Sequence, residues 1–235
     1  IGTSALEVEA QTYHDIDFTP SSGSPTYTLG TAASQTLTAS GTVVFGNGTN
    51  AVTVTAATYG PAIDIDENVT INGAGTLIAS STPAFTVGAN WTNSGIFTHS
   101  SGTVTFDSTA SGRTINASSS PFFDVVFDGS GGVWSPLTST TTVSNNLTLT
   151  NGTLDNSNGT ANMEINGNIQ GTSGAFNFTL NTAEQRVNGA TQSFGTTSGA
   201  TAWNFNDLTF SNSSGSTAAT ISTNTGGTGG ITASS

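Results

Sequence analysis

A short motif, Asp followed by two residues and Phe, occurs three times in this chain of 235 residues. The copies are Asp15–Phe18, Asp124–Phe127 and Asp207–Phe210, and each runs into a turn of small residues. The interval between the first two copies is longer than that between the last two, so we infer an insertion in the first copy, around Phe45–Gly75. Self-similarity at a long period indicates a repeat architecture, whose function usually belongs to the long surface that its stacked copies build.

Nearly every apolar stretch between these motifs alternates with a period of two. Examples are Ala51–Thr55, Ile63–Asp66, Thr103–Phe106, Leu147–Thr150 and Phe176–Leu180. Such alternation places apolar side chains on one face of a strand and Thr, Asn or Asp on the other. Frequent Asn-Gly pairs supply tight turns, and no segment carries a helical stripe. The pattern predicts an all-β chain of a dozen or more short strands.

Two all-β architectures fit this pattern: a parallel β-solenoid and a pair of tandem β-sandwiches. We favour the solenoid because no linker separates the copies, and because the inferred insertion is close to one coil in length. The chain then holds about two and a third repeats. The predicted division is an N-terminal strand or inter-subunit segment at 1–12, repeats at 13–121 and 122–202, and a partial repeat at 203–235.

The charge is strongly one-sided, and this excludes several kinds of partner. The net charge is -12. The chain has no Lys, and its two Arg residues are Arg113 and Arg186. Nucleic acids and anionic lipids are recognised by clusters of Lys and Arg, so neither is a predicted partner. No apolar run is long enough for a transmembrane helix. The Ser- and Thr-rich, cysteine-free and acidic composition is typical of secreted and cell-surface proteins and predicts that location.

The segments Asn90–Phe106 and Asn146–Asp155 resemble the repeats of large prokaryotic extracellular β-solenoid proteins. These include surface adhesins in the style of filamentous haemagglutinin and autotransporter passengers. The resemblance implies a stalk, filament or surface layer, and it transfers no active-site residue. We therefore predict an extracellular structural protein that associates end to end with copies of itself, or whose coils continue within a longer chain.

Two other functions stay open from the sequence. The first is an adhesin or carbohydrate-binding surface module that grips glycans or a cell surface. Its candidates for stacking on sugars are Trp91, Trp134 and Trp203, together with Tyr13, Tyr27 and Tyr59. The second is a polysaccharide-active β-helix enzyme. We do not expect an enzyme, because the two Arg residues recur in like contexts instead of converging, and neither His14 nor His99 lies in a metal-binding spacing.

One acidic cluster is a candidate metal site. Asp64, Asp66 and Glu67 are the densest group of carboxylates, and Asp64 and Asp66 share a strand face. Carboxylate oxygens at this spacing suit Ca²⁺, so calcium is the one cofactor we consider; a solvated strand face is the alternative. The Asp residues that open the three motifs occupy equivalent repeat positions, which predicts a structural role such as bonding backbone N–H groups at a coil corner.

Asn-x-Ser/Thr sequons are frequent, and in a secreted protein they are candidate glycosylation sites. They begin at Asn47, Asn68, Asn90, Asn116, Asn146, Asn151, Asn158, Asn177 and Asn212.

Overall fold

The computed structural model shows an all-β protein built from stacked coils of parallel strands. It describes residues 6–137, 140–156, 161–171, 175–178, 184–188, 203–205, 207–210 and 231–233, which contain no helix. The contacts divide the chain into two units, Ile1–Thr105 (unit 1) and Phe106–Ser235 (unit 2). Each strand pairs with a strand one coil away in the sequence. The predicted parallel β-solenoid is confirmed, and the tandem β-sandwich is wrong.

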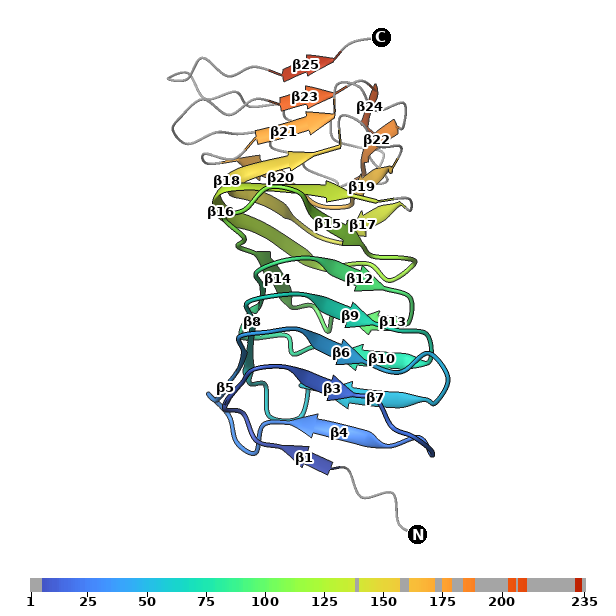
Figure 1. The fold of residues 1–235 in the computed structure, drawn as a ribbon. Helices are drawn as coiled ribbons and strands as arrows, with labels where there is room; N and C mark the ends of the chain where they lie inside the picture. The colour runs from blue at the N-terminus through green and yellow to red at the C-terminus, as the bar shows by residue number, and fades with distance from the viewer. Residues whose placement is uncertain are drawn as a thin grey trace. The chain divides into compact units, whose positions relative to one another are not determined.

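Unit 1 has three faces, and the chain visits them in the order A, B, C before it begins the next coil (Figure 1). Face A consists of β1 (Leu6–Val8), β4 (Thr26–Leu29), β7 (Val52–Thr55), β10 (Gly75–Ile78) and β13 (Ile96–Thr98). Face B consists of β2 (Thr12–Tyr13), β5 (Thr36–Ala39), β8 (Ala62–Ile65) and β11 (Phe85–Val87). Face C consists of β3 (Ile16–Phe18), β6 (Val43–Phe45), β9 (Val69–Ile71) and β12 (Trp91–Asn93). The strand β14 (Thr103–Phe106) contains the boundary with unit 2.

Unit 2 follows the same plan with longer strands that bend around a corner. On face D the first part of β16 (Asp124–Pro136) pairs with the first part of β18 (Leu147–Asp155), which pairs with β20 (Ile169–Gly171). Face E contains β15 (Arg113–Asn116), the second parts of β16 and β18, β21 (Ala175–Phe178), β23 (Trp203–Phe205) and β25 (Ile231–Ala233). Face F contains β17 (Thr141–Val143), β19 (Met163–Ile165), β22 (Glu184–Val187) and β24 (Asp207–Phe210).

The structural repeat is one coil, and it is much shorter than the repeat read from the sequence. Hydrogen-bonded residues at equivalent corners of neighbouring coils are 27 residues apart for Asp15 and Thr42 and 22 residues apart for Asn68 and Asn90. The step from Thr42 to Asn68 spans 26 residues. This equals the excess of the first motif interval over the second, so the inferred insertion has the length of one coil. The domain boundaries predicted from the longer repeat stay a prediction.

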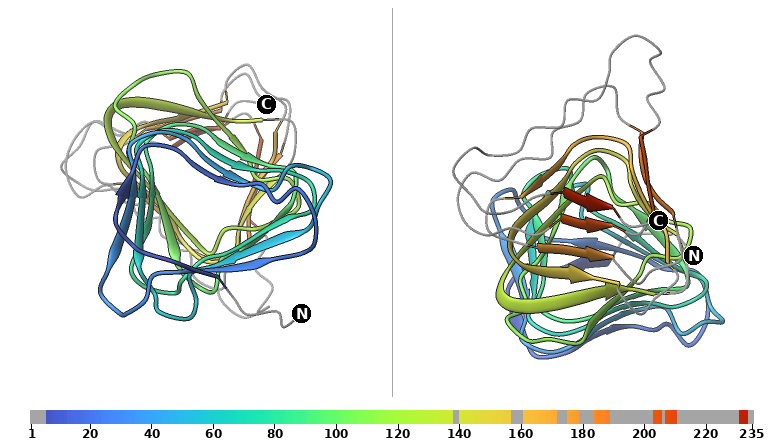
Figure 2. Two further views of the ribbon diagram at one scale, coloured as in Figure 1. Left: turned by 60° about the horizontal axis from the view of Figure 1, so that its bottom comes forward. Right: turned by 90° about the horizontal axis from the view of Figure 1, so that it is seen from above.

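The core follows directly from the alternation in the sequence. In β7 Val52 and Val54 are buried while Thr53 and Thr55 are half-buried and point outward. Because coils stack in register, inward residues form continuous files, such as Leu37, Ile63 and Phe85 on face B. Seen along the stack in Figure 2, the coils of unit 1 superimpose around a shared interior.

Aromatic residues fill the widest parts of this interior. In unit 1 the rings of Phe18 and Phe45, which pair across coils, stack with their centroids 5.4 Å apart. In unit 2 Phe127 stacks on Phe106 at 5.3 Å and contacts Trp134 at 5.1 Å. Offset ring pairs at these separations add stability beyond the area that they bury.

Candidate functional site

A ladder of polar side chains runs up the corner before face C of unit 1. The Asp15 carboxylate accepts a hydrogen bond from the Thr42 backbone N–H at 2.7 Å, one coil further on. Asn68 then donates to the Thr42 hydroxyl, and its own side-chain oxygen accepts from the Asn90 amide at 2.8 Å. Each of these residues lies immediately before a strand of face C, so one rung marks the start of each strand.

Unit 2 repeats this corner ladder before face D. The Asp124 carboxylate accepts from the Asn146 backbone N–H at 2.8 Å and from the Asn145 side chain at 2.9 Å. The Asn146 side-chain oxygen accepts in turn from the Asn168 backbone N–H at 2.9 Å. The predicted structural role is therefore confirmed for Asp15 and Asp124, since both bond a backbone N–H at a coil corner.

The three copies of the motif do not occupy equivalent positions, and this prediction was wrong. The ladder after Asp15 passes through Thr42, Asn68 and Asn90, and further steps of 22 residues reach positions 112 and 134 without meeting Asp124. Asp124–Phe127 lies on face D, whereas Asp207–Phe210 is β24 of face F. The rungs at Asn146 and Asn168 are one coil, or 22 residues, apart. Further steps of 22 residues reach positions 190 and 212, so no step falls on Asp207. The two Arg residues, which lie in similar sequence contexts, are not structurally equivalent either. Arg113 lies in β15 of face E, and Arg186 lies in β22 of face F.

The ladder affects the protonation of its first rung. The hydrogen bond from the Thr42 backbone, together with that from His14, holds the pKa of Asp15 below its usual value. A lowered pKa in the folded state means that this carboxylate stabilises the fold above the ordinary pKa of Asp. That contribution is lost as the pH falls through the lowered value.

The calcium candidates lie at the end of face B. Asp64 points outward from β8, and Asp66 and Glu67 are exposed in the turn that follows. Burial raises the pKa of Asp64, and the negative charge of Asp66 adds to this effect. Within the described parts of the chain, no group of three or more His, Cys, Asp or Glu side chains is arranged to hold a metal ion. Calcium at these residues stays a prediction.

The histidines and the described tryptophans serve local structure. His14 pairs with Asp15 at 2.9 Å on the surface, and His99 accepts a hydrogen bond from the Ser101 backbone in a turn. Trp91 and Trp134 are fully buried, so they fill the core instead of offering a surface on which sugars could stack. The side chain of Trp203 lies outside the described part.

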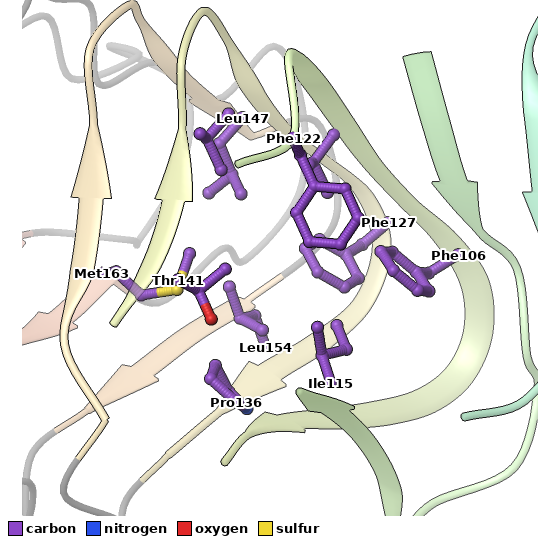
Figure 3. Close-up of a pocket in the computed structure, with 11 residues that line it drawn as sticks. Phe106, Ile115, Phe122, Phe127, Pro136, Thr141, Leu147, Leu154 and Met163 are labelled. Atoms are coloured by element: carbon purple, nitrogen blue, oxygen red, sulfur yellow. The ribbon is translucent and has the colours of Figure 1, made fainter. Parts of the chain in front are cut away.

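An apolar cavity lies within unit 2 (Figure 3). Its lining includes Phe106, Phe122, Phe127, Leu154 and Met163. The free space is about 10 Å³, which is at the lower limit for one water molecule. Thr141 is the polar residue of this lining; it is 4% exposed, and its hydroxyl has no hydrogen-bond partner among the described residues. A water molecule needs two or more polar partners, so we expect the cavity to be dry.

A second hollow in unit 2 is open and polar. It is lined by Ser118, Ser119, Ser120, Thr140 and Thr142. None of these residues carries a charge at neutral pH, and the lining holds no pair of groups suited to acid–base chemistry.

Comparison with protein families, with curated proteins and with solved structures finds no match to this chain. No helix that could cross a membrane occurs in the part of the chain that the structure describes. The β-solenoid fold is therefore established by the structure alone, and the resemblance to surface adhesins supports only a proposal.

Sequence reasoning identified the first rung of each ladder but missed the Asn rungs above it. The signal is a polar residue directly before an apolar strand, recurring at intervals of 22 to 27 residues: Thr42, Asn68 and Asn90 after Asp15, and Asn146 and Asn168 after Asp124. Asn68, Asn90 and Asn146 also begin sequons, which conceals this role. Their side chains are half-buried and engaged in the ladder.

We predict that Asn146→Ala lowers the free energy of unfolding by about 1 kcal/mol, because the Asn168 N–H loses its acceptor at a partly buried corner. Chemical denaturation measures the effect. Asn162→Ala is the matched control, since Asn162 is exposed and should change stability by less than about 0.5 kcal/mol. Equal effects of the two substitutions would show that the ladder bond contributes nothing.

We predict that Thr141→Val raises the free energy of unfolding by about 1 kcal/mol, because it replaces a buried, unpartnered hydroxyl with a methyl group of similar size. The control is Thr142→Val, one residue along β17, where the side chain is half-buried and points outward. A loss of stability on Thr141→Val alone would reveal a partner for the hydroxyl.

We predict that removal of divalent cations with a chelator leaves the melting temperature unchanged. The contrary outcome is a drop of several degrees that added Ca²⁺ reverses and that Asp64→Asn abolishes. Asp17→Asn, on an outward position of face C, serves as the control. A drop in melting temperature that Ca²⁺ reverses and that Asp64→Asn abolishes would assign a structural ion to Asp64, Asp66 and Glu67.

Proposed function

We propose that this protein is an extracellular structural component whose solenoids associate end to end into a filament, stalk or surface layer. The observation that carries the proposal is the open edge of the first coil. Its strands β1, β2 and β3 each lie at the end of a sheet, so each pairs on one side only among the described strands. A strand edge of this kind is a template for another chain.

The direction of the backbone groups defines this edge. The carbonyls of Val8, Tyr13 and Phe18 accept hydrogen bonds from Gly30, Ser40 and Gly46 in the second coil at 2.8 to 3.0 Å. Successive residues of a strand direct their backbone groups to opposite sides. The alternate residues Glu7, Thr12 and Asp17 therefore direct N–H and C=O groups away from the second coil.

Charge supports one direction of assembly. The first coil carries four carboxylates, Glu7, Glu9, Asp15 and Asp17, whereas residues 211–235 carry no charged side chain. Two first coils meeting head to head would bring like charges together. A head-to-tail contact avoids this repulsion, and because it does not close on itself it yields a fibre.

The partner is a second copy of this chain, which presents the open edge of its last described strand, β25. That strand pairs with β23 and with no other described strand. A preceding coil of a longer polypeptide would cover the first coil in the same manner. The adhesin and the polysaccharide-active enzyme remain weaker alternatives, since Trp91 and Trp134 are buried and the polar hollow of unit 2 holds no acid–base pair.

We predict that the chain forms concentration-dependent polymers and that Asp17→Pro weakens their association at least tenfold. Proline removes the Asp17 N–H, which points to the open edge, and spares the bonds to the second coil. Asp17→Ala is the matched control, because it removes the carboxylate and keeps the N–H. Sedimentation velocity and electron microscopy measure assembly.

Two outcomes would overturn the proposal. One is a native chain that stays monomeric at high concentration. In that case the edge of the first coil would pair with a segment of a longer polypeptide and not with a second copy. The other is polymerisation of the proline variant at the native concentration with an unchanged melting temperature.

A further inference from the structure

The outer surface of face A in unit 1 is rich in β-branched residues. Its outward positions in β4, β7, β10 and β13 are all β-branched, and we call this set the threonine face: Thr26, Thr28, Thr53, Thr55, Thr76, Ile78, Ile96 and Thr98. The residues between them, such as Val54, Leu77 and Phe97, are buried. The threonine face contains neither a charged nor an aromatic side chain.

These residues form a grid because the coils pair in register. One file runs through Thr26, Thr53, Thr76 and Ile96, and the other through Thr28, Thr55, Ile78 and Thr98. Neighbouring strands are about 4.8 Å apart and alternate residues of one strand about 6.6 Å apart. Figure 1 shows β4, β7 and β10 running in the same direction, one above another. Thr side chains therefore recur at the strand spacing, with Ile in place of Thr at one position of each file.

Most hydroxyls of the threonine face are available to a ligand. Thr55 accepts a hydrogen bond from the Ala57 backbone at 3.2 Å, and none of the other five Thr hydroxyls has a partner among the described residues. Thr28 is only 6% exposed, so its hydroxyl is closed to a ligand. The accessible hydroxyls without a partner are those of Thr26, Thr53, Thr76 and Thr98. Each hydroxyl can donate one hydrogen bond and accept two, and water bound to neighbouring rungs is held at a repeating separation.

A rigid periodic grid selects a ligand that is itself periodic. We consider three classes of such ligands: minerals, crystalline polysaccharides and ice. A mineral surface of hard cations would require carboxylates. A crystalline polysaccharide would be recognised by exposed aromatic rings, and none of the eight residues of the threonine face is aromatic. Ice requires only hydroxyl groups that fix water and methyl groups that leave its lattice undisturbed. Ile96, which is 56% exposed, supplies such methyl groups beside the Thr files.

We propose that the threonine face binds ice, with its Thr hydroxyls anchoring ordered water that joins the crystal lattice. The Glu7 side chain marks one limit of the face, where its carboxylate accepts a hydrogen bond from the Tyr59 hydroxyl at 3.0 Å. The remaining described carboxylates of unit 1 lie on faces B and C, at their corners or in the first coil, and so do not interrupt the grid. The activity is independent of end-to-end assembly.

Ice recrystallisation and thermal hysteresis of the full chain provide the test. We expect the native chain to inhibit ice growth, and Thr53→Tyr to raise the concentration required at least tenfold by projecting a ring from the middle of the grid. Thr70→Tyr is the matched control, since Thr70 is a half-buried, outward residue of the same coil on face C. It should leave inhibition unchanged.

The exposed position Thr98 offers a second variant, Thr98→Tyr, in case substitution at Thr53 impairs folding. Melting curves of each variant establish that the coils are intact. The proposal is overturned if the native chain affects ice no more than serum albumin does, or if Thr53→Tyr and Thr70→Tyr have equal effects. Retention of the chain on crystalline cellulose or chitin without an effect on ice would also overturn it.

Discussion

Hydrogen bonding between successive coils is the interaction on which the rest of this structure depends. A coil of three short strands has few contacts within itself, so each strand is stable only when a strand of the next coil pairs with it. Parallel pairing in register then aligns the inward residues into files, such as Leu37, Ile63 and Phe85. The polar ladders that begin at Asp15 and Asp124 extend this bonding through the corners, where strand pairing ends.

The same stacking accounts for both of the functions that we propose. A stack of coils has ends, and the first coil directs the backbone groups of Glu7, Thr12 and Asp17 away from its neighbour. A stack also has faces on which outward residues repeat with the spacing of the strands. End-to-end assembly uses the first property and ice binding the second, so one chain can serve both without a catalytic site.

Several features could be predicted from local patterns. Period-two alternation indicated the strands and which of their residues are buried, as in Val52–Thr55. The repeated Asp indicated the corner bonds of Asp15 and Asp124. The Asn rungs were missed because an Asn before a strand resembles an ordinary turn residue or a sequon. The equivalence of Asp15, Asp124 and Asp207 was misjudged because neither interval between the motif copies corresponds to whole coils.

The sequence by itself determined the all-β class and the inward residues, because these depend on alternation and turn chemistry within a few residues. It favoured the parallel solenoid over tandem sandwiches, because no linker separates the copies of the motif. The length of a coil, the partners of each corner side chain and the threonine face were decided only by the tertiary structure. Each of these depends on which residue lies above which in the next coil. That register is set by packing and hydrogen bonding between segments a full coil apart, as in Thr76 with Ile96 and Trp203 with Ile231. Patterns within a few residues do not reach across that separation.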